Sequence, residues 1–459
     1  MDDIKNINVI DYLKKKLPEV HEKEQEEFLL SMGITKEKDN FKLEHNQFSK
    51  FAFDYIQVVL KGNQKELSIY NFKKGVYENE YVEETLGKII KYLLNYITDL
   101  WNPTWEDLIV KTLKRDTHTV VNNFNNGEFV NLKNGILDLE TFELKEHSPQ
   151  YYSTIQLPIE YKKSAKTTIF NKFLDDITCS DDELKTILQE IVGYCLCNST
   201  KAEKAFFFIG SGCNGKSVLA KVIQLLVGEN NYSNTPLSAL SGNFGLASLI
   251  NSNVNIAAEN NNGKLNSEVF KAVISGDTVE INRKYRDAIS VPLHTKLIFL
   301  FNELPDNGDL THGFFRKIII IPFDRTFKGA EIDVDMFSKL EKEISGIFQW
   351  AIDGLKRLKE NDYKFSSCSA SDKCLEDYKR ELNPVAEFFD THFKLDSNQQ
   401  IKRSEIYNHY QEYCYKNSYE TLQCQKFWKL LKSHWSDRGY NFTLKKIKGY
   451  EHFVGFNFN

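Results

Sequence analysis

Residues 205–223 read AFFFIGSGCNGKSVLAKVI: an apolar run, a glycine-rich loop and the start of an amphipathic helix. A strand followed by Gly-x-x-x-x-Gly-Lys-Ser and a helix is the arrangement that cradles a polyphosphate, and this context disfavours a chance match. The glycines permit positive-φ turns that aim N–H groups at phosphates, and the helix N-terminus adds partial positive charge. We predict that Lys216 contacts the β- and γ-phosphates of ATP and that Ser217 binds Mg²⁺. The predicted nucleotide-binding residues are Gly210, Gly212, Asn214, Gly215, Lys216 and Ser217.

Further apolar runs follow this motif along the chain. They are short and nearly continuous, which is typical of strands buried on both faces of a mostly parallel sheet. With the run at 205–209, the predicted strands are Val254–Ala258, Leu297–Phe301 and Ile318–Ile321. The sequence therefore predicts an α/β fold around the phosphate loop.

Three polar residues stand at the ends of these runs. Glu259 closes the second run, where a carboxylate faces the nucleotide crevice and can hold the Mg²⁺ shell or polarise the attacking water. Asn302 closes the third and can orient that water, although an asparagine also suits the turn that follows. Arg316 precedes the fourth, and an arginine from a neighbouring subunit can stabilise the transferred γ-phosphate. The predicted catalytic residues are Lys216, Glu259, Asn302 and Arg316, and the predicted metal ligands are Ser217 and Glu259.

The order of these features resembles helicase superfamily three, in its phage, plasmid and poxvirus-type primase-helicase branch. The resemblance covers about Phe129 to the C-terminus and includes Asn134-Gly135, Gly193-Tyr194, Ser275-Gly276-Asp277, Asn302 to Pro305 and Arg316 to Phe323. It implies an AAA+ core, a hexameric ring with ATP at the subunit interfaces, and translocation along DNA in the central channel. It also implies that Asn302 is a sensor and that Arg316 reaches the neighbour's ATP. The sequence departs from the pattern at Asn260, where many relatives have a second acid, and at Lys317, where arginine is frequent.

The same resemblance implies two DNA-contacting segments. The second half of residues 271–285 would be a hairpin in the channel, with cations for phosphates and an aromatic ring for a base. The C-terminal segment resembles a winged-helix module, whose helix enters a major groove. Residues 425–450 contain seven Lys or Arg and one acid, Asp437. A solvated basic face is the alternative for both segments. The predicted DNA contacts are Lys271, Arg283, Lys284, Tyr285, Lys426, Lys429, Lys432, Lys445, Lys446 and Lys448.

Length and composition are those of a multidomain soluble protein. The chain has 459 residues, 41% hydrophobic and 27% charged, with a net charge of -5. DNA binding must therefore come from local basic surfaces. Eight cysteines without a Cys-x-x-Cys pair indicate reduced thiols. Because no stretch has the pattern of a signal peptide or membrane span, we expect a cytoplasmic protein of a bacterial host cell with no membrane partner.

We expect three domains and several local elements. The domains are an α+β N-terminal collar or interaction domain (1–160), the AAA+ helicase domain with a helical collar (161–365) and a winged-helix domain (366–459). The local elements are hairpins at 67–77 and 131–139, the latter turning at Asn134-Gly135, helices at 103–114 and 183–196, one long helix at 337–358, and a linker at 366–372.

The functional prediction is an ATP-dependent replicative DNA helicase and replication initiator of a phage, plasmid or pathogenicity island. Its partners would be origin duplex, single-stranded DNA and further copies of itself. A separate primase is expected, because Asp333-Val334-Asp335 lies in a poor context for a two-metal site. The alternatives are an initiator that uses ATP only as an assembly switch, a packaging or transposition ATPase, and an RNA helicase. A zinc site at His409, Cys414, Cys424 and His434 matches no common ligand spacing, which favours core packing for these residues.

Overall fold

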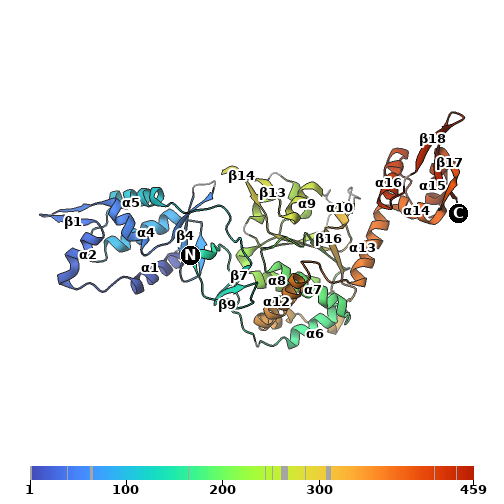
Figure 1. Cartoon of the computed structure of the whole chain (residues 1–459). Coiled ribbons are helices and arrows are strands. Elements are labelled where there is room, and N and C mark those ends of the chain that lie inside the picture. The colour runs from blue at the N-terminus through green and yellow to red at the C-terminus, as the bar shows by residue number, and fades with distance from the viewer. Residues whose placement is uncertain are drawn as a thin grey trace.

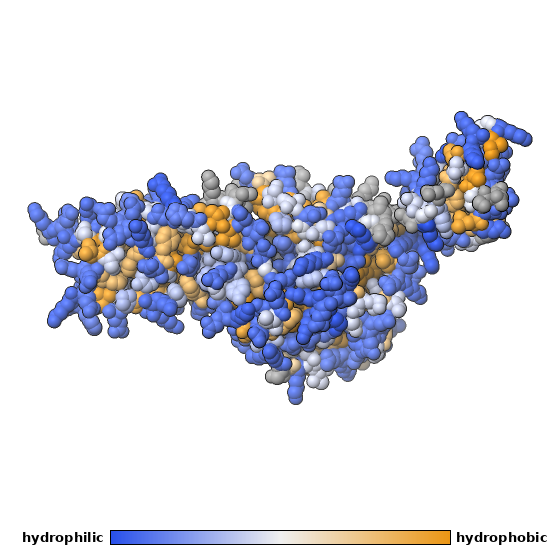
Figure 2. Space-filling model, viewed as in Figure 1, coloured by the Kyte–Doolittle hydropathy of each residue, from blue (hydrophilic) through white to orange (hydrophobic). Residues whose placement is uncertain are grey.

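The computed structural model arranges the chain as three parts in a row (Figure 1). The N-terminal part lies at one end, the central part contains the largest sheet, and helix α13 (Ser369–Leu382) leads to the C-terminal part. The structure describes residues 3–38, 40–62, 66–163, 165–242, 244–250, 252–259, 267–284, 286–305, 312–417, 419–440 and 442–458. Within these ranges, no helix is both long enough and apolar enough to cross a membrane. Figure 2 shows that the face in view is mainly hydrophilic, with small hydrophobic patches.

The N-terminal part packs helices against a four-stranded sheet of order β5-β4-β3-β6. The predicted hairpin at 67–77 is confirmed, because β4 and β5 pair with Tyr70 opposite Tyr77. The predicted helix after Pro103 is also confirmed, and the Asn102 side chain caps it by accepting from the Trp105 N–H at 2.9 Å. The elements are α1 (Asp3–Lys16), α2 (Gln25–Ser31), β1 (Ile34–Glu37), β2 (Asn40–Leu43), α3 (His45–Phe53), β3 (Val58–Lys61), β4 (Glu66–Asn71), β5 (Val76–Glu78), α4 (Val82–Leu94), α5 (Pro103–Asp116) and β6 (Val120–Val121).

Strands β7 (Phe129–Leu132), β8 (Gly135–Asp138) and β9 (Leu144–Lys145) form a small antiparallel sheet. The predicted hairpin at 131–139 is confirmed, but its turn is one residue earlier than expected. Leu132 pairs with Gly135, so Lys133 and Asn134 form the turn.

This small sheet, which the sequence analysis groups with the N-terminal domain, packs on the central part. Val130, Leu137 and Leu157 belong to the same apolar cluster as the helices of the central part. Glu128 accepts a hydrogen bond from the Lys359 ammonium at 2.9 Å. The small sheet therefore packs on the central helices, while Asn131 of β7 also donates to the Gly75 carbonyl of the N-terminal part at 2.7 Å.

The central sheet has five parallel strands in the order β11-β12-β15-β10-β16. All four predicted strands are confirmed, and the short strand β11 was not predicted. Successive side chains of β10 enter apolar clusters on opposite faces of the sheet. Phe206 and Phe208 belong to one cluster, and Phe207 belongs to the other. Burial on both faces explains why these runs are continuously apolar. The strands are β10 (Ala205–Ile209), β11 (Tyr232–Ser233), β12 (Val254–Glu259), β15 (Lys296–Phe301) and β16 (Ile318–Pro322).

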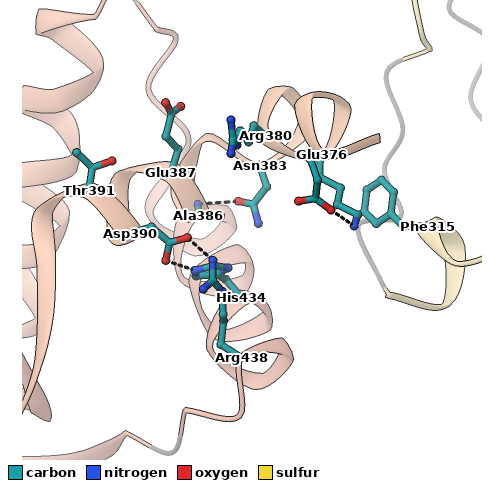
Figure 3. Close-up of a pocket in the computed structure, with 11 residues that line it drawn as sticks. Phe315, Glu376, Arg380, Asn383, Ala386, Glu387, Asp390, Thr391, His434 and Arg438 are labelled. Carbon is teal, nitrogen blue, oxygen red and sulfur yellow. Dashed lines mark hydrogen bonds and ion pairs between the residues drawn. The ribbon is translucent and has the colours of Figure 1, made fainter. Parts of the chain in front are cut away.

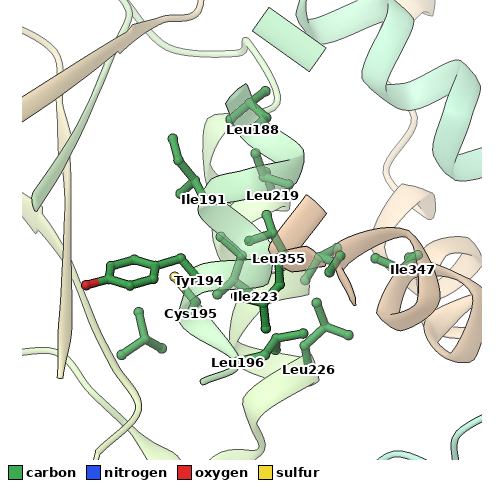
Figure 4. Close-up of a cluster of buried hydrophobic side chains, with 14 of the residues drawn as sticks. Leu188, Ile191, Tyr194, Cys195, Leu196, Leu219, Ile223, Leu226, Ile347 and Leu355 are labelled. Atoms are coloured by element: carbon green, nitrogen blue, oxygen red, sulfur yellow. The ribbon is translucent and has the colours of Figure 1, made fainter. Parts of the chain in front are cut away.

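Helices cover both faces of this sheet. The first face is covered by α6 (Thr168–Ile177), α7 (Asp182–Cys195), α8 (Lys216–Val227), α11 (Met336–Glu341) and α12 (Ile344–Glu360). Figure 4 shows Ile191 of α7, Ile223 of α8 and Leu355 of α12 converging in this cluster. The helix predicted at 183–196 is α7, and it touches α12 closely: a Cβ at Gly193 would lie 2.3 Å from the Ala351 carbonyl oxygen. The other face is covered by α9 (Ser267–Ser275), α10 (His312–Phe315) and α13.

The single long helix expected at 337–358 is wrong, because the structure has α11 and α12 with a break at Lys342 and Glu343. The Glu343 carboxylate accepts from the N–H groups of Ile169 and Phe170 at 3.0 and 2.9 Å. It therefore satisfies free donors at the start of α6, a tertiary contact that helical periodicity does not reveal.

The linker expected at 366–372 is also wrong. The Ser366 N–H and hydroxyl both donate to Glu190, at 2.8 and 2.6 Å, and Ser369 begins α13. The Tyr378 hydroxyl donates to the Pro305 carbonyl at 2.6 Å. Residues 366–382 thus belong to the central part, and the C-terminal cluster begins at Val385.

The C-terminal part has the order helix, strand, helix, helix, strand, strand around an aromatic core. Its antiparallel sheet has the order β17-β19-β18. Cys414 is buried in this core, and no group of three or more potential metal ligands occurs among the described residues. The elements are α14 (Pro384–His392), β17 (Phe393–Lys402), α15 (Arg403–Lys416), α16 (Cys424–Asp437), β18 (Thr443–Ile447) and β19 (Tyr450–Phe458).

Candidate nucleotide and DNA sites

The predicted phosphate loop connects the end of β10 to the start of α8, the local arrangement that the sequence predicts. Gly215 immediately precedes α8 with φ of 82°, a conformation that favours glycine. A Cβ there would also lie 2.3 Å from Cγ2 of Ile177 in α6. The loop is therefore fixed by backbone conformation and by packing against α6.

Lys216 is buried at the base of the loop. Its ammonium donates to the Gly210 carbonyl at 2.8 Å and to the Phe301 carbonyl. Burial lowers the pKa of Lys216. Ser217 lies exposed in the first turn of α8, where its hydroxyl is accessible to a metal ion.

Asn214 braces the loop against the neighbouring strand. It is 3% exposed, and its amide donates to the Phe323 carbonyl at 3.3 Å. Its side-chain oxygen accepts from the Lys216 N–H at 3.3 Å. Its side chain therefore holds the loop, while Gly212 has φ of 104° and open space around it.

The structure brings the predicted strand-end residues to the same edge as the loop. Glu259 ends β12 opposite Phe301, and Asn302 follows β15, which lies between β12 and β10. Because the strands are parallel, their carboxyl ends meet at one edge. Asn302 is exposed, and the Glu259 side chain and Asn260 lie outside the described residues.

Arg316 does not converge with these residues within one chain. It is exposed and lies two residues before Ile318, which pairs with Ala205 at the opposite end of β10 from the phosphate loop. The Lys204 ammonium donates to the Arg316 carbonyl. Lys317, in contrast, is buried, and its ammonium donates to Glu203 at 2.8 Å and to the Ser275 hydroxyl at 2.6 Å. Lys317 thus has a structural role here.

The hairpin expected within residues 271–285 is present as β13 (Thr278–Arg283) and β14 (Arg286–Pro292). Lys284 is exposed at its turn, and Arg283 donates to the Asp287 carbonyl at 3.1 Å. Lys271 lies on α9, outside the hairpin, and Tyr285 lies outside the described residues.

The basic residues predicted in the C-terminal part are all exposed. On α16 the Lys426, Lys429 and Lys432 side chains are accessible, whereas Phe427 and Leu431 of the same helix are fully buried. Lys445 and Lys446 lie on β18, and Lys448 forms the β18–β19 turn with Gly449, both with positive φ. The structure therefore presents a basic helix face and a basic hairpin in the same compact part.

A pocket lies where α13, α14 and the end of α16 meet (Figure 3). Asp390 of α14 accepts from His434 at 2.9 Å and from Arg438 at 2.7 Å. These two contacts join the end of α16 to α14 and so support the helix that exposes the lysines.

Lys296 positions β15, a role that the sequence analysis did not predict. Lys296 is buried at the start of β15, and its ammonium donates to the Cys197 and His294 carbonyls at 2.6 and 2.8 Å. It also lies 4.9 Å from the Tyr194 ring centre. These contacts hold the strand leading to Asn302 against the segment after α7, and the signal in the sequence was a charge beside an apolar run.

The Asp-x-Asp segment does not form an acidic cluster. The Asp333 carboxylate accepts from the Asp335 N–H at 3.0 Å and pairs with Lys339 at 2.5 Å. Among the residues that the structure describes, no other carboxylate joins them in a possible metal site.

Three family models match separate segments of the chain. Residues 208–316 match a family of unknown function (DUF5906), residues 106–179 match the D5 N terminal like model, and residues 383–439 match the RFX DNA-binding domain. The first covers the phosphate loop, the strand ends and the hairpin.

Two of the curated relatives are longer viral proteins. A putative helicase of Invertebrate iridescent virus 6 is 24% identical over 387 residues, covering 72% of this chain and 39% of the relative. A putative helicase of Acanthamoeba polyphaga mimivirus is 24% identical over 249 residues, covering 50% of this chain and 25% of the relative. The chain thus spans well under half the length of these relatives.

Solved structures show the same fold over most of the chain. An apo structure of the NrS-1 C-terminal region matches with a TM-score of 0.51 at 14% identity, covering 88% of this chain and 97% of the other. A second, of its residues 305–718, matches with a TM-score of 0.51 at 12% identity. The chain is therefore a mixed α/β protein similar in fold to that region, and similar in sequence, at low identity, to putative helicases.

Proposed function

We propose that this chain is an ATP-dependent DNA helicase that initiates replication of a mobile genetic element. The observation that carries the proposal is the shared sheet edge: the phosphate loop after β10, Asn302 after β15 and the end of β12 at Glu259 lie on adjacent parallel strands. This arrangement can hold ATP and Mg²⁺ and orient a hydrolytic water. The names of the viral relatives support the helicase class.

The proposed assembly is a hexameric ring of AAA+ cores with ATP between subunits. Arg316 supports it, because this exposed arginine lies at the sheet end away from its own phosphate loop. A head-to-tail interface would place one subunit's Arg316 edge against the next subunit's nucleotide, and repetition of that interface closes a ring. Hairpin β13–β14, with Lys284 at its turn, would contact single-stranded DNA in the channel.

The C-terminal part is proposed to be a winged-helix module that binds origin duplex. Support comes from the exposed lysines of α16, from the basic β18–β19 hairpin and from the match to the RFX DNA-binding domain model. Its helix would enter the major groove and its hairpin would lie on the phosphate backbone. Within this class we propose an initiator of the type found in staphylococcal pathogenicity islands, acting in a bacterial cytoplasm with a separate primase.

Strand displacement on a forked duplex tests the proposal. The full chain with ATP and Mg²⁺ should release the displaced strand, and the Lys216→Ala variant should not, because it lacks the charge that binds the phosphates. The alternative function is an initiator that uses ATP as an assembly switch. It predicts ATP-dependent ring formation without displacement, so a ring seen by negative-stain microscopy that hydrolyses ATP but leaves the fork intact would contradict the motor. An RNA helicase would release strands from an RNA fork and not from DNA.

A further inference from the structure

A groove on the N-terminal part lies between the end of α1 and the turn that joins β4 to β5. The rings of Tyr12 and Phe72 stack there, with centres 4.0 Å apart and planes 2° from parallel. Both side chains are half-buried, so the stacked pair fixes the two segments together and forms an aromatic floor. The groove is lined by Asp11, Tyr12, Lys14, Lys15, Phe72 and Lys73.

The groove is positively charged, and its charge comes from two elements. Lys14 and Lys15 are exposed in the last turn of α1, where the helix dipole alone favours cations. The helix dipole does not explain Lys73, because Lys73 lies in the β4–β5 turn and lines the groove from that side. Asp11 is the one acidic residue among the lining residues that the structure describes, and it lies 3.6 Å from the Lys14 ammonium. The groove therefore favours an anionic ligand.

An aromatic floor flanked by lysines matches the chemistry of a nucleic-acid strand. Lysines neutralise phosphates, and the exposed parts of aromatic rings contact bases or sugars of any sequence. Lys16 adds a further ammonium 5.9 Å from the Tyr12 ring centre. An acidic peptide would use the lysines alone and gain nothing specific from the stacked rings.

We infer that this groove binds a segment of single-stranded DNA outside the proposed channel. The inference rests on the proposed function, since unwinding would supply the strand. The groove would hold a separated strand on the N-terminal part while the β13–β14 hairpin contacts DNA on the central part.

Charge reversal in the groove provides the test, with a matched control. The groove variant is Lys14→Glu/Lys15→Glu/Lys73→Glu in the full chain. The control is Lys23→Glu/Lys50→Glu/Lys111→Glu, which makes the same charge change at exposed lysines of the same part. The probe is a fluorescein-labelled oligothymidylate, and its anisotropy gives the affinity between 50 and 200 mM salt, about the range in which phosphate contacts are resolved.

The groove variant should lower the slope of log affinity against log salt by about 2, from roughly 0.7 for each of three lost contacts. The control should keep the parental slope. Tyr12→Leu should weaken binding without changing the slope, because it removes a stacking surface and no charge. Thermal unfolding of each variant identifies any variant that fails to fold. If Tyr12→Leu fails to fold, the lysine variants alone decide the question.

Equal slopes for the groove variant and the parental chain would overturn the inference. The proposed function would survive that result if Lys284→Ala still lowered the slope. A parental chain that binds no single-stranded DNA would overturn the inference and the proposed function together.

Discussion

Arg316→Ala should abolish ATP turnover although the residue lies far from its own chain's phosphate loop. Strand β10 separates the two, and its five residues span roughly 16 Å at about 3.3 Å per residue. At that separation in water a unit charge contributes about 0.3 kcal/mol, which changes a rate less than about twofold. Salt reduces the effect further, because the Debye length is about 8 Å under physiological conditions.

A contact across a subunit interface predicts a much larger effect. An arginine that touches the transferred phosphoryl group accelerates hydrolysis by about 10³- to 10⁵-fold. Steady-state ATPase assays of the parental protein and of Arg316→Ala, at saturating ATP, separate the two cases by more than two orders of magnitude. ATP affinity should remain near the parental value, since the arginine acts chiefly on transition-state charge.

Mixing variants tests whether the action is in trans. Arg316→Ala has an intact phosphate loop and Lys216→Ala an intact arginine, so in an equal mixture about a quarter of the head-to-tail interfaces combine both intact residues. The mixture should recover a corresponding share of the parental ATPase rate. Less than a twofold loss in Arg316→Ala alone, or no recovery in a mixture with demonstrated subunit exchange, would refute the reasoning.

The remaining predictions concern the loop, its thiol, a buried thiol and the hairpin. Gly215→Ala should destabilise the protein by about 2–5 kcal/mol in urea unfolding, because it adds left-handed backbone strain and a clash with Ile177. Gly212→Ala has open space around it, so it should cost only the backbone strain of about 1–2 kcal/mol. Equal losses would show that packing on α6 does not restrain the loop. Mg-ATP should slow alkylation of Cys213, which is exposed in the loop, and should not affect exposed Cys424. Mass spectrometry measures both rates, and an equal rate at Cys213 with and without nucleotide would contradict the proposed nucleotide site. Burial raises the pKa of Cys195 to about 12, so this thiol should resist iodoacetamide at pH 9 in the folded protein and react in urea. Because its pKa is raised on folding, Cys195 stabilises the fold fully below about pH 9 and progressively less toward pH 12, so Cys195→Ala should flatten the alkaline decline in unfolding free energy. Lys284→Ala should reduce strand displacement and lower the slope of log affinity for single-stranded DNA against log salt by roughly 0.7. Parental values for both measurements would show that Lys284 does not contact DNA.

Local order along the chain could be predicted from the sequence. The apolar runs at 205–209, 297–301 and 318–321 were predicted as buried strands, because they leave no polar face for water and are short for helices. The glycine spacing fixed the loop, and alternation with helices fixed a parallel sheet. Exposed lysines on α16 also followed from helical spacing, because Phe427 and Leu431 had to face the core.

The partners of individual side chains could not be predicted in the same way. Glu343 breaks a long amphipathic pattern because two N–H groups of α6, far away in the sequence, need an acceptor. Ser366 looked like linker, but buried Glu190 takes both of its donors. Lys296 is a charge beside an apolar strand, and only the fold supplies the carbonyl groups that satisfy it.

From consecutive residues alone we could predict the glycine-rich loop, the parallel strands and the basic C-terminal helix, since each follows from local conformational limits and burial. Three features became visible only in the fold: the packing of the small sheet on the central part, the contact by which Asn214 braces the loop, and the position of Arg316 at the other end of the sheet from Lys216. These features depend on the order and direction of the strands, because order and direction determine which strand ends meet. The number of residues between a given residue and the loop does not indicate at which end of the sheet that residue lies.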